Sequence, residues 1–192
     1  MRREHETPFS QMVWSQEGRK VGRYFLDHAL MISDVLVEIE LACQARADGR
    51  KFIAAHSLGA LQQKGAAFRW AATLNGKRVG LVPDAVFGIA KLGCETHIIF
   101  LEADRGTMPI TRRGNHLSSI SRKLAAYTAL WKAGRFSERF GTSRFTVLIV
   151  TPGEERAASI RKAITNLPTG GGLFYCCPLS EVLSNPSLMW ER

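Results

Sequence analysis

The sequence predicts an α/β protein in which a mixed β-sheet is flanked by helices. Three observations predict it: a long amphipathic helix stands first, strands separated by short turns follow, and the C-terminal half alternates helix and strand. Strands joined by tight turns pair antiparallel, whereas strands joined through a helix pair parallel. The expected order is α-β-β-β-α-β-α-β, in a single domain over residues 21–192 after a polar lead-in at residues 1–20.

The helices are predicted from apolar residues that recur with a helical period. Such a pattern runs from Tyr24 to Ala47, and Gly49 is a suitable stop. A second apolar stripe predicts a helix over residues 116–133, and "EERAASIRKAIT" predicts a third over residues 154–165.

The strands are predicted from short apolar runs between turn residues. The segment 51–74 is ambiguous and could hold one or two strands. "NGKR" then predicts a turn, and "RVGLVPDAVFGIA" predicts a strand over residues 78–90. "KLGCE" turns the chain so that "THIIFLEAD" returns beside it. "RFTVLIVT" predicts a buried strand, and the turn at "TGGG" leads to the last strand at "LFYCC".

The charge balance favours a polyanionic partner. Twenty-six Lys and Arg against 17 Asp and Glu give a net charge of +9 and a pI near 9.8. Such an excess favours nucleic acid over membrane, although solubility alone would also explain it. No signal peptide or long apolar span occurs, and the four cysteines lack the paired spacing of a metal site. We therefore expect a reduced, cytoplasmic protein that does not enter a membrane.

Three carboxylates are expected to meet at the mouth of one hairpin. If the turn is centred on Gly93, Asp84 lies opposite Glu102, with Cβ atoms roughly 5 Å apart, and Asp104 shares their face. Like charges so placed repel each other, and a divalent cation such as Mg²⁺ would relieve the repulsion because it takes one or two carboxylates. The alternative is that Glu102 and Asp104 are exposed and pair with nearby arginines.

Cationic residues follow these acids in the sequence. Lys123 lies one helical turn before Tyr127, so both should face the strand ends, where a lysine could stabilise charge on a metal-bound phosphate. Arg105, Arg112 and Arg113 are expected to contact DNA phosphates. Tyr127 is a candidate for contact with nucleic acid too, although its place in the apolar stripe favours the core.

These residues resemble a known superfamily. "PDA" at 83–85 and "FLEAD" at 100–104 resemble the PD-(D/E)xK nucleases, whose core places Pro-Asp on its second strand and Glu-x-Lys on its third. More narrowly, "PDAVFGI", "FLEADRGTMPITR" and "RKLAAYTALW" resemble the plasmid replication-relaxation family, which is thought to act in replication and relaxation of plasmid DNA. The resemblance covers about residues 25–177.

The resemblance implies a restriction-endonuclease-like fold and a set of metal ligands. Asp84 and Glu102 would hold Mg²⁺ or Mn²⁺, Asp104 would support the ion directly or through water, and Glu38 or Glu40 of the first helix could add a ligand. Where the superfamily expects a lysine, this chain has Asp104, and some branches place that lysine on the following helix, where Lys123 stands.

Two functions follow from the resemblance. The first is a divalent-metal-dependent DNA phosphodiesterase, with Asp84, Glu102, Asp104 and Lys123 as its catalytic set. The second is a catalytically silent DNA-binding or assembly module in plasmid maintenance, which the misplaced lysine favours. The resemblance also implies that family members often carry a winged-helix DNA-binding part, and we expect this chain to correspond to the catalytic-type domain alone. The expected partners are therefore plasmid DNA and a separate DNA-binding or replication protein, and a homodimer stays open.

Overall fold

The structure is a computed structural model that describes residues 16–58, 70–111, 119–134 and 136–189. Five strands form one mixed sheet in the order β1-β4-β5-β6-β7, and β2 and β3 form a separate two-stranded sheet. The strands are β1 (Lys51–Ile53), β2 (Trp70–Leu74), β3 (Lys77–Leu81), β4 (Ala85–Ala90), β5 (His97–Ala103), β6 (Phe145–Thr151) and β7 (Phe174–Pro178). The helices are α1 (Gln16–Ala45), α2 (Ile120–Lys132), α3 (Phe136–Phe140), α4 (Glu154–Thr165) and α5 (Leu179–Ser184), with short 3₁₀ turns at Ala55–Ser57, Gly171–Leu173 and Pro186–Met189.

Strand direction changes at β5, as the mixed-sheet prediction requires. β1, β4 and β5 pair antiparallel, whereas β6 runs parallel to β5 and β7 parallel to β6. The start of β4 therefore meets the carboxyl ends of β5, β6 and β7 at one edge of the sheet. Helices cross from β5 to β6 and from β6 to β7, which is how parallel neighbours are connected.

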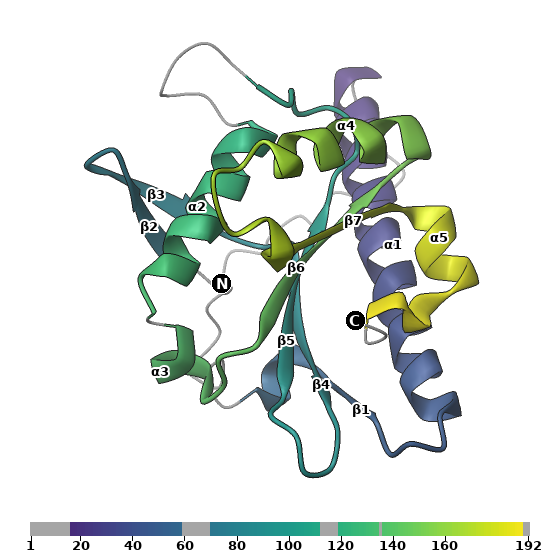
Figure 1. The fold of residues 1–192 in the computed structure, drawn as a ribbon. Coiled ribbons are helices and arrows are strands. Elements are labelled where there is room, and N and C mark those ends of the chain that lie inside the picture. The colour runs from purple at the N-terminus through teal and green to yellow at the C-terminus, as the bar shows by residue number, and fades with distance from the viewer. Residues whose placement is uncertain (1–15, 59–69, 112–118, 135, 190–192) are drawn as a thin grey trace, which may run out of the picture.

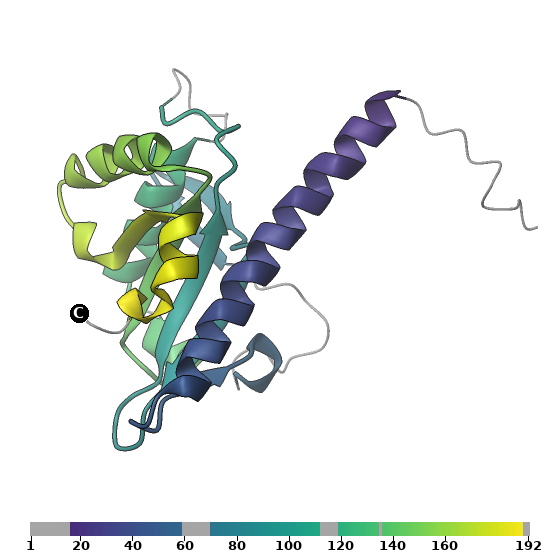
Figure 2. The same cartoon turned by 90° about the vertical axis from the view of Figure 1, so that its right-hand side faces the viewer.

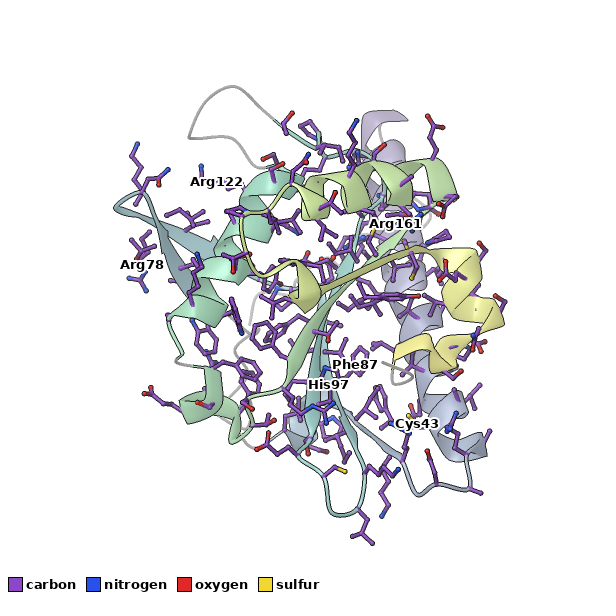
Figure 3. All side chains as sticks on the ribbon, in the orientation of Figure 1. Cys43, Arg78, Phe87, His97, Arg122 and Arg161 are labelled. Carbon is purple, nitrogen blue, oxygen red and sulfur yellow. The ribbon has the colours of Figure 1, made fainter. Side chains whose placement is uncertain are left out.

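Helices cover both faces of the sheet (Figure 1). α1 and α5 pack on one face, and α2, α3, α4 and the β2–β3 hairpin pack on the other. β5 shows the alternation that both layers require, since Ile99 and Leu101 face α1 while Ile98 and Phe100 face α2. The side chains in Figure 3 fill the space on the two sides, with Phe87 on the α1 side.

The first helix begins earlier than predicted. It starts at Gln16 rather than near Tyr24, so residues 16–20 of the expected lead-in are helical, and its N-terminal end extends past the rest of the fold (Figure 2). Met31, Val35 and Ile39 form its buried stripe. Among the helices within the described ranges, none combines the length and apolar character needed to cross a membrane.

The predicted strand over residues 78–90 is two strands, which is a correction. Pro83 lacks the N–H that a strand interior needs, and residues 82–84 interrupt the strand. β3 therefore pairs with β2 through a turn at Asn75 and Gly76, both with positive φ, while β4 joins the main sheet. The helix expected over residues 116–133 begins at Ile120 after the N-cap Ser119. Residues 112–118 lie outside the described ranges.

Candidate functional site

A cavity of about 370 Å³ opens at the sheet edge where β4 begins and β5 ends. Its polar lining combines acids from the sheet, cations from the following segments and one histidine from α1. These residues are His28, Asp84, Glu102, Asp104, Arg105, Lys123 and Tyr127. Phe25, Met108, Ile120, Leu124 and Ile149 supply much of its apolar wall.

Asp84 and Glu102 occupy opposed positions on neighbouring strands. Ala85 pairs with Leu101, and the Asp84 N–H continues the ladder with a 2.9 Å hydrogen bond to the Leu101 carbonyl. The predicted register, centred on Gly93, is therefore confirmed, and Gly93 has a positive φ at the turn. Opposed side chains lie on the same face of a sheet, and both acids line the cavity.

The Asp84 carboxylate is held by the neighbouring strand and by α1. Its Oδ2 accepts a 2.8 Å hydrogen bond from the Ala103 N–H, and its Oδ1 lies 3.2 Å from His28 Nε2. The side chain is 23% exposed, so solvent reaches it from the cavity. The other ring nitrogen of His28, Nδ1, is buried without a hydrogen-bond partner.

Glu102 is buried, because β5 turns it toward α2 on the same side as Phe100. Its Oε1 accepts a 2.7 Å hydrogen bond from the Tyr127 hydroxyl, and its Oε2 forms an ion pair with Lys123 Nζ. The side chain is 7% exposed. Burial raises the pKa of Glu102, and the Lys123 ammonium and the Tyr127 hydroxyl act in the opposite direction.

Lys123 and Tyr127 lie one turn apart on α2, which places both against Glu102 as predicted. Burial alone would lower the pKa of Lys123, but the charges of Glu102, Asp84 and Asp104 outweigh it, so the pKa is raised. Burial and the Glu102 charge raise the pKa of Tyr127 well above its ordinary value. At neutral pH Lys123 is therefore a cation and a hydrogen-bond donor, and it cannot serve as a base.

Asp104 has its own cation, which the sequence did not reveal. Arg156 of α4 binds it through two hydrogen bonds, Nε to Oδ2 at 2.6 Å and Nη2 to Oδ1 at 3.2 Å. The Gly106 N–H also donates to Oδ2 at 3.2 Å, and Arg156 Nη2 donates to the Met108 carbonyl. The repulsion that predicted a metal is thus partly relieved by protein cations, Lys123 for Glu102 and Arg156 for Asp104.

The structure does not bring every predicted residue to the cavity. Glu38 is ten residues beyond His28 on α1, about 15 Å along the helix axis, and Glu40 is exposed and hydrogen-bonded to Gln44. Arg112 and Arg113 lie outside the described residues, whereas Arg105 lines the cavity.

Tyr127 offers no ring face to a base. The residue is 1% exposed, and its ring packs between Phe100 and Phe174 with centroids 5.8 and 6.4 Å away. The prediction that it contacts nucleic acid by stacking is therefore replaced by a role in holding Glu102.

Sequence reasoning did not include Arg156 in this site, and it expected ordinary packing for His28 while leaving a place near the site open. His28 had a detectable signal, because it shares a helical face with Met31 and Val35 and must therefore point at the sheet. Arg156 lies in the first turn of the helix after β6, so it belongs to the same sheet edge as Asp104. That signal becomes visible only once β5 and β6 are known to be parallel neighbours.

Grouped metal ligands are scarce in the described part of the chain. Within residues 16–58, 70–111, 119–134 and 136–189, no three His, Cys, Asp or Glu side chains are grouped so that they could hold a metal ion. The cavity contains a pair of opposed carboxylates, Asp84 and Glu102, as candidate ligands for a cation.

Comparison with known proteins identifies the family. No curated protein and no solved structure matches the chain. The family model described as replication-relaxation matches residues 4–146, a range that contains Asp84, Glu102 and Lys123. The chain therefore belongs to the replication-relaxation family.

Proposed function

We propose that the chain acts on DNA in plasmid replication, and that its cavity is a divalent-metal-dependent phosphodiesterase site. Membership in the replication-relaxation family indicates a role related to plasmid replication. The net charge of +9 suits a polyanionic ligand, since lysine and arginine contacts to phosphates dominate affinity for DNA.

One observation carries the proposal: Asp84 and Glu102 meet across β4 and β5 in a cavity that Lys123 also lines. The PD-(D/E)xK superfamily uses an acid pair so placed together with a lysine. The sheet supports the same likeness, because β1, β4 and β5 are antiparallel, β6 is parallel to β5, and α2 connects β5 to β6. Pro83–Asp84 stands at the start of the second strand of this set, and Glu102 stands on the third.

The donor set suits one hard divalent cation. Mg²⁺ is commonly held by one or two carboxylates, with water and substrate phosphate completing its octahedron. Asp84 and Glu102 would hold the ion, and the ion would activate water and neutralise charge on the phosphodiester. Lys123, charged beside Glu102, would stabilise the negative charge that develops on phosphate oxygens.

A catalytically silent DNA-binding module is the second candidate. Position 104, where the superfamily expects its lysine, is an aspartate bound at two points by Arg156. The lysine function would then depend on Lys123 alone, and Lys123 is engaged with Glu102. This candidate predicts DNA binding without cleavage.

A plasmid-nicking assay separates the two candidates. The purified protein is incubated with supercoiled plasmid and Mn²⁺, beside Asp84→Asn, Glu102→Gln and Lys123→Ala. Matched controls are Glu95→Gln, an acid bound by Thr142 at the opposite end of β5, and Lys132→Ala, an exposed lysine on α2. Mn²⁺ affinity, measured by calorimetry, provides a readout independent of turnover.

The phosphodiesterase predicts nicking that falls at least about 100-fold in all three site variants and stays unchanged in both controls. Mn²⁺ binding should weaken in Asp84→Asn and Glu102→Gln. Salt-sensitive plasmid binding by the parent protein without nicking would refute the enzyme and support the silent module.

A further inference from the structure

The β2–β3 hairpin (residues 70–81) is a two-stranded sheet separate from the main one. In Figure 1 it extends from the body beside α2, with its turn at the outer end. The turn is a tight two-residue one, because Asn75 and Gly76 both have positive φ, as a type I′ turn requires. Within the described part of the chain, a Cβ added to Gly76 at this tip would meet nothing within 4 Å.

One face of the hairpin anchors it. Trp70, Ala72, Leu74, Val79 and Leu81 belong to the core that includes α2 and α3. Trp70 stacks on Phe136 and Phe140, with centroids 6.5 and 6.3 Å away, and the Arg139 guanidinium lies 5.1 Å from the Trp70 ring centre. The hairpin is therefore fixed to the body along most of its length.

The other face is small, polar and free of acids. It pairs Ala71 with Gly80 and Thr73 with Arg78, and Thr73, Arg78 and Gly80 are exposed. Among the described residues, a Cβ added to Gly80 would meet nothing within 4 Å. Lys77, also exposed, pairs with Leu74 and adds a second positive charge at the tip, on the anchored side of the hairpin. Figure 3 places Arg78 at the edge of the molecule.

The sequence around the hairpin is strongly basic. Residues 49–83 contain six Lys and Arg and no Asp or Glu. Two-thirds of the chain's excess positive charge of +9 therefore comes from fewer than one-fifth of its residues. Positive charge concentrated in one segment is typical of a nucleic-acid-binding surface, whereas solubility requires only that excess positive charge be spread over the surface.

The hairpin also has a size and position that suit duplex DNA. The major groove is about 12 Å wide and admits a two-stranded β-ribbon. β3 leads through Val82 and Pro83 directly to Asp84, which lines the cavity and stands seven positions after Lys77. An extended chain of that length spans at most about 23 Å, which is less than one turn of B-DNA, about 34 Å.

We infer that the β2–β3 hairpin is a duplex-DNA contact, with Lys77 and Arg78 on phosphates and the face of Thr73 and Gly80 against the groove. The inference rests on the proposed function in one respect, that DNA is the ligand, and it does not require cleavage. The duplex would lie across the tip of the hairpin and the mouth of the cavity.

The test measures binding without turnover. Fluorescence anisotropy of a labelled 30-base-pair duplex is recorded from 50 to 300 mM salt, in EDTA, for the full chain and for Lys77→Gln/Arg78→Gln. The matched control is Lys91→Gln/Lys162→Gln, which removes two exposed lysines outside the basic stretch of residues 49–83. Thr73→Glu, with Thr73→Gln beside it, tests the exposed face through a different side chain.

The hairpin variant should bind duplex at least about tenfold more weakly at 100 mM salt. Its plot of log affinity against log salt should be shallower by about 1.8, because two phosphate contacts are lost. Thr73→Glu should weaken binding and Thr73→Gln should not, while the lysine control stays within about twofold. Equal losses in the hairpin variant and the control would overturn the inference, and so would an equal loss on a 30-nucleotide single strand.

The same measurement keeps this inference apart from the proposed function. If the hairpin variant binds duplex as tightly as the parent protein and the parent protein nicks plasmid, only the hairpin contact is refuted. A parent chain that binds neither duplex nor plasmid refutes both.

Discussion

Arg156 and Asp104 form a two-point ion pair at the end of β5, although 52 residues of chain separate them. The Asp104 side chain is 6% exposed and that of Arg156 20%. Removing one partner of a buried pair leaves a desolvated charge. Arg156→Ala should therefore lower the free energy of unfolding by about 2–4 kcal/mol, measured by urea denaturation.

Glu154→Gln is the control for this prediction, because the Glu154–Arg161 pair lies on the same helix but is exposed. It should cost less than about 1 kcal/mol. The double variant Asp104→Asn/Arg156→Ala should cost less than the sum of its single changes. Additive costs would show that the two residues do not stabilise each other.

Tyr127→Phe tests the hydrogen bond to buried Glu102. The change keeps the ring packed on Phe100 and removes only the donor, so the loss should be about 1–3 kcal/mol, as for a hydrogen bond to a charged group. Thermal unfolding of Tyr127→Phe beside Tyr175→Phe, whose hydroxyl binds the less buried Glu181, provides the comparison. A smaller effect at Tyr127 than at Tyr175 would contradict this assignment.

Position 88 favours glycine because neighbouring side chains leave little room for a Cβ, and not because its φ is positive. A Cβ there would lie 2.9 Å from Thr96 Cγ2 and 3.1 Å from Leu58 Cδ2. Gly88→Ala should destabilise the fold by about 1–3 kcal/mol through overpacking, measured by urea denaturation. Thr96→Ser removes the nearer methyl and should restore part of the loss. Gly80→Ala, with open space around it, should change stability by less than about 1 kcal/mol.

His97 should make the fold sensitive to acid. Burial, with a smaller effect of Arg144, lowers the pKa of His97 to about 4, and its Nε2 lies 2.9 Å from Thr146 Oγ1. As the pH falls, His97 becomes protonated near pH 6.5 in the unfolded chain but only near pH 4 in the folded chain. The stability that neutral His97 contributes is therefore full above pH 6.5 and is lost as the pH falls toward 4.

Urea denaturation at several pH values measures this effect in the parent protein and in His97→Gln. The parent should lose about 1–2 kcal/mol more than the variant across this range, a figure reduced to allow for the partial exposure of the ring. Identical slopes for the two proteins would contradict a buried neutral imidazole.

The four cysteines should differ sharply in reactivity. Cys94 is exposed in the β4–β5 turn, whereas Cys43, Cys176 and Cys177 are buried. Burial raises the pKa of Cys176 and Cys177 to about 12, so the reactive thiolate is scarce. A disulfide reagent should modify one thiol rapidly in the native protein and four after unfolding. Cys94→Ser should abolish the rapid phase.

Local patterns were sufficient to predict most of the sheet and the acid pair. The register of β4 and β5 follows from two apolar runs around Gly93, and the helical stripe of α2 predicts that Lys123 and Tyr127 face Glu102. α3 and α5 have five and six residues, too few for a helical period to show. The break at Pro83 was hidden because apolar residues lie on both sides of it.

The pairings that complete the site could not be predicted from the sequence. His28 lies 56 residues from Asp84 and Arg156 lies 52 residues from Asp104. Such contacts depend on strand order and on where each crossover helix begins. Sequence spacing encodes neither. The sequence therefore predicted a divalent ion, or nearby arginines, beside acids whose charges Lys123 and Arg156 partly neutralise.

The direction change at β5 has a practical consequence for anyone trimming the chain to its homologous stretch. The family match ends at residue 146, just inside β6, whereas α4, β7 and Arg156 follow it. A fragment of residues 4–146 would expose the hydrogen-bonding edge of β5, and exposed strand edges promote aggregation. The fragment would also lack Arg156, the counter-ion of Asp104. The folded unit thus extends beyond the residues that match the family model.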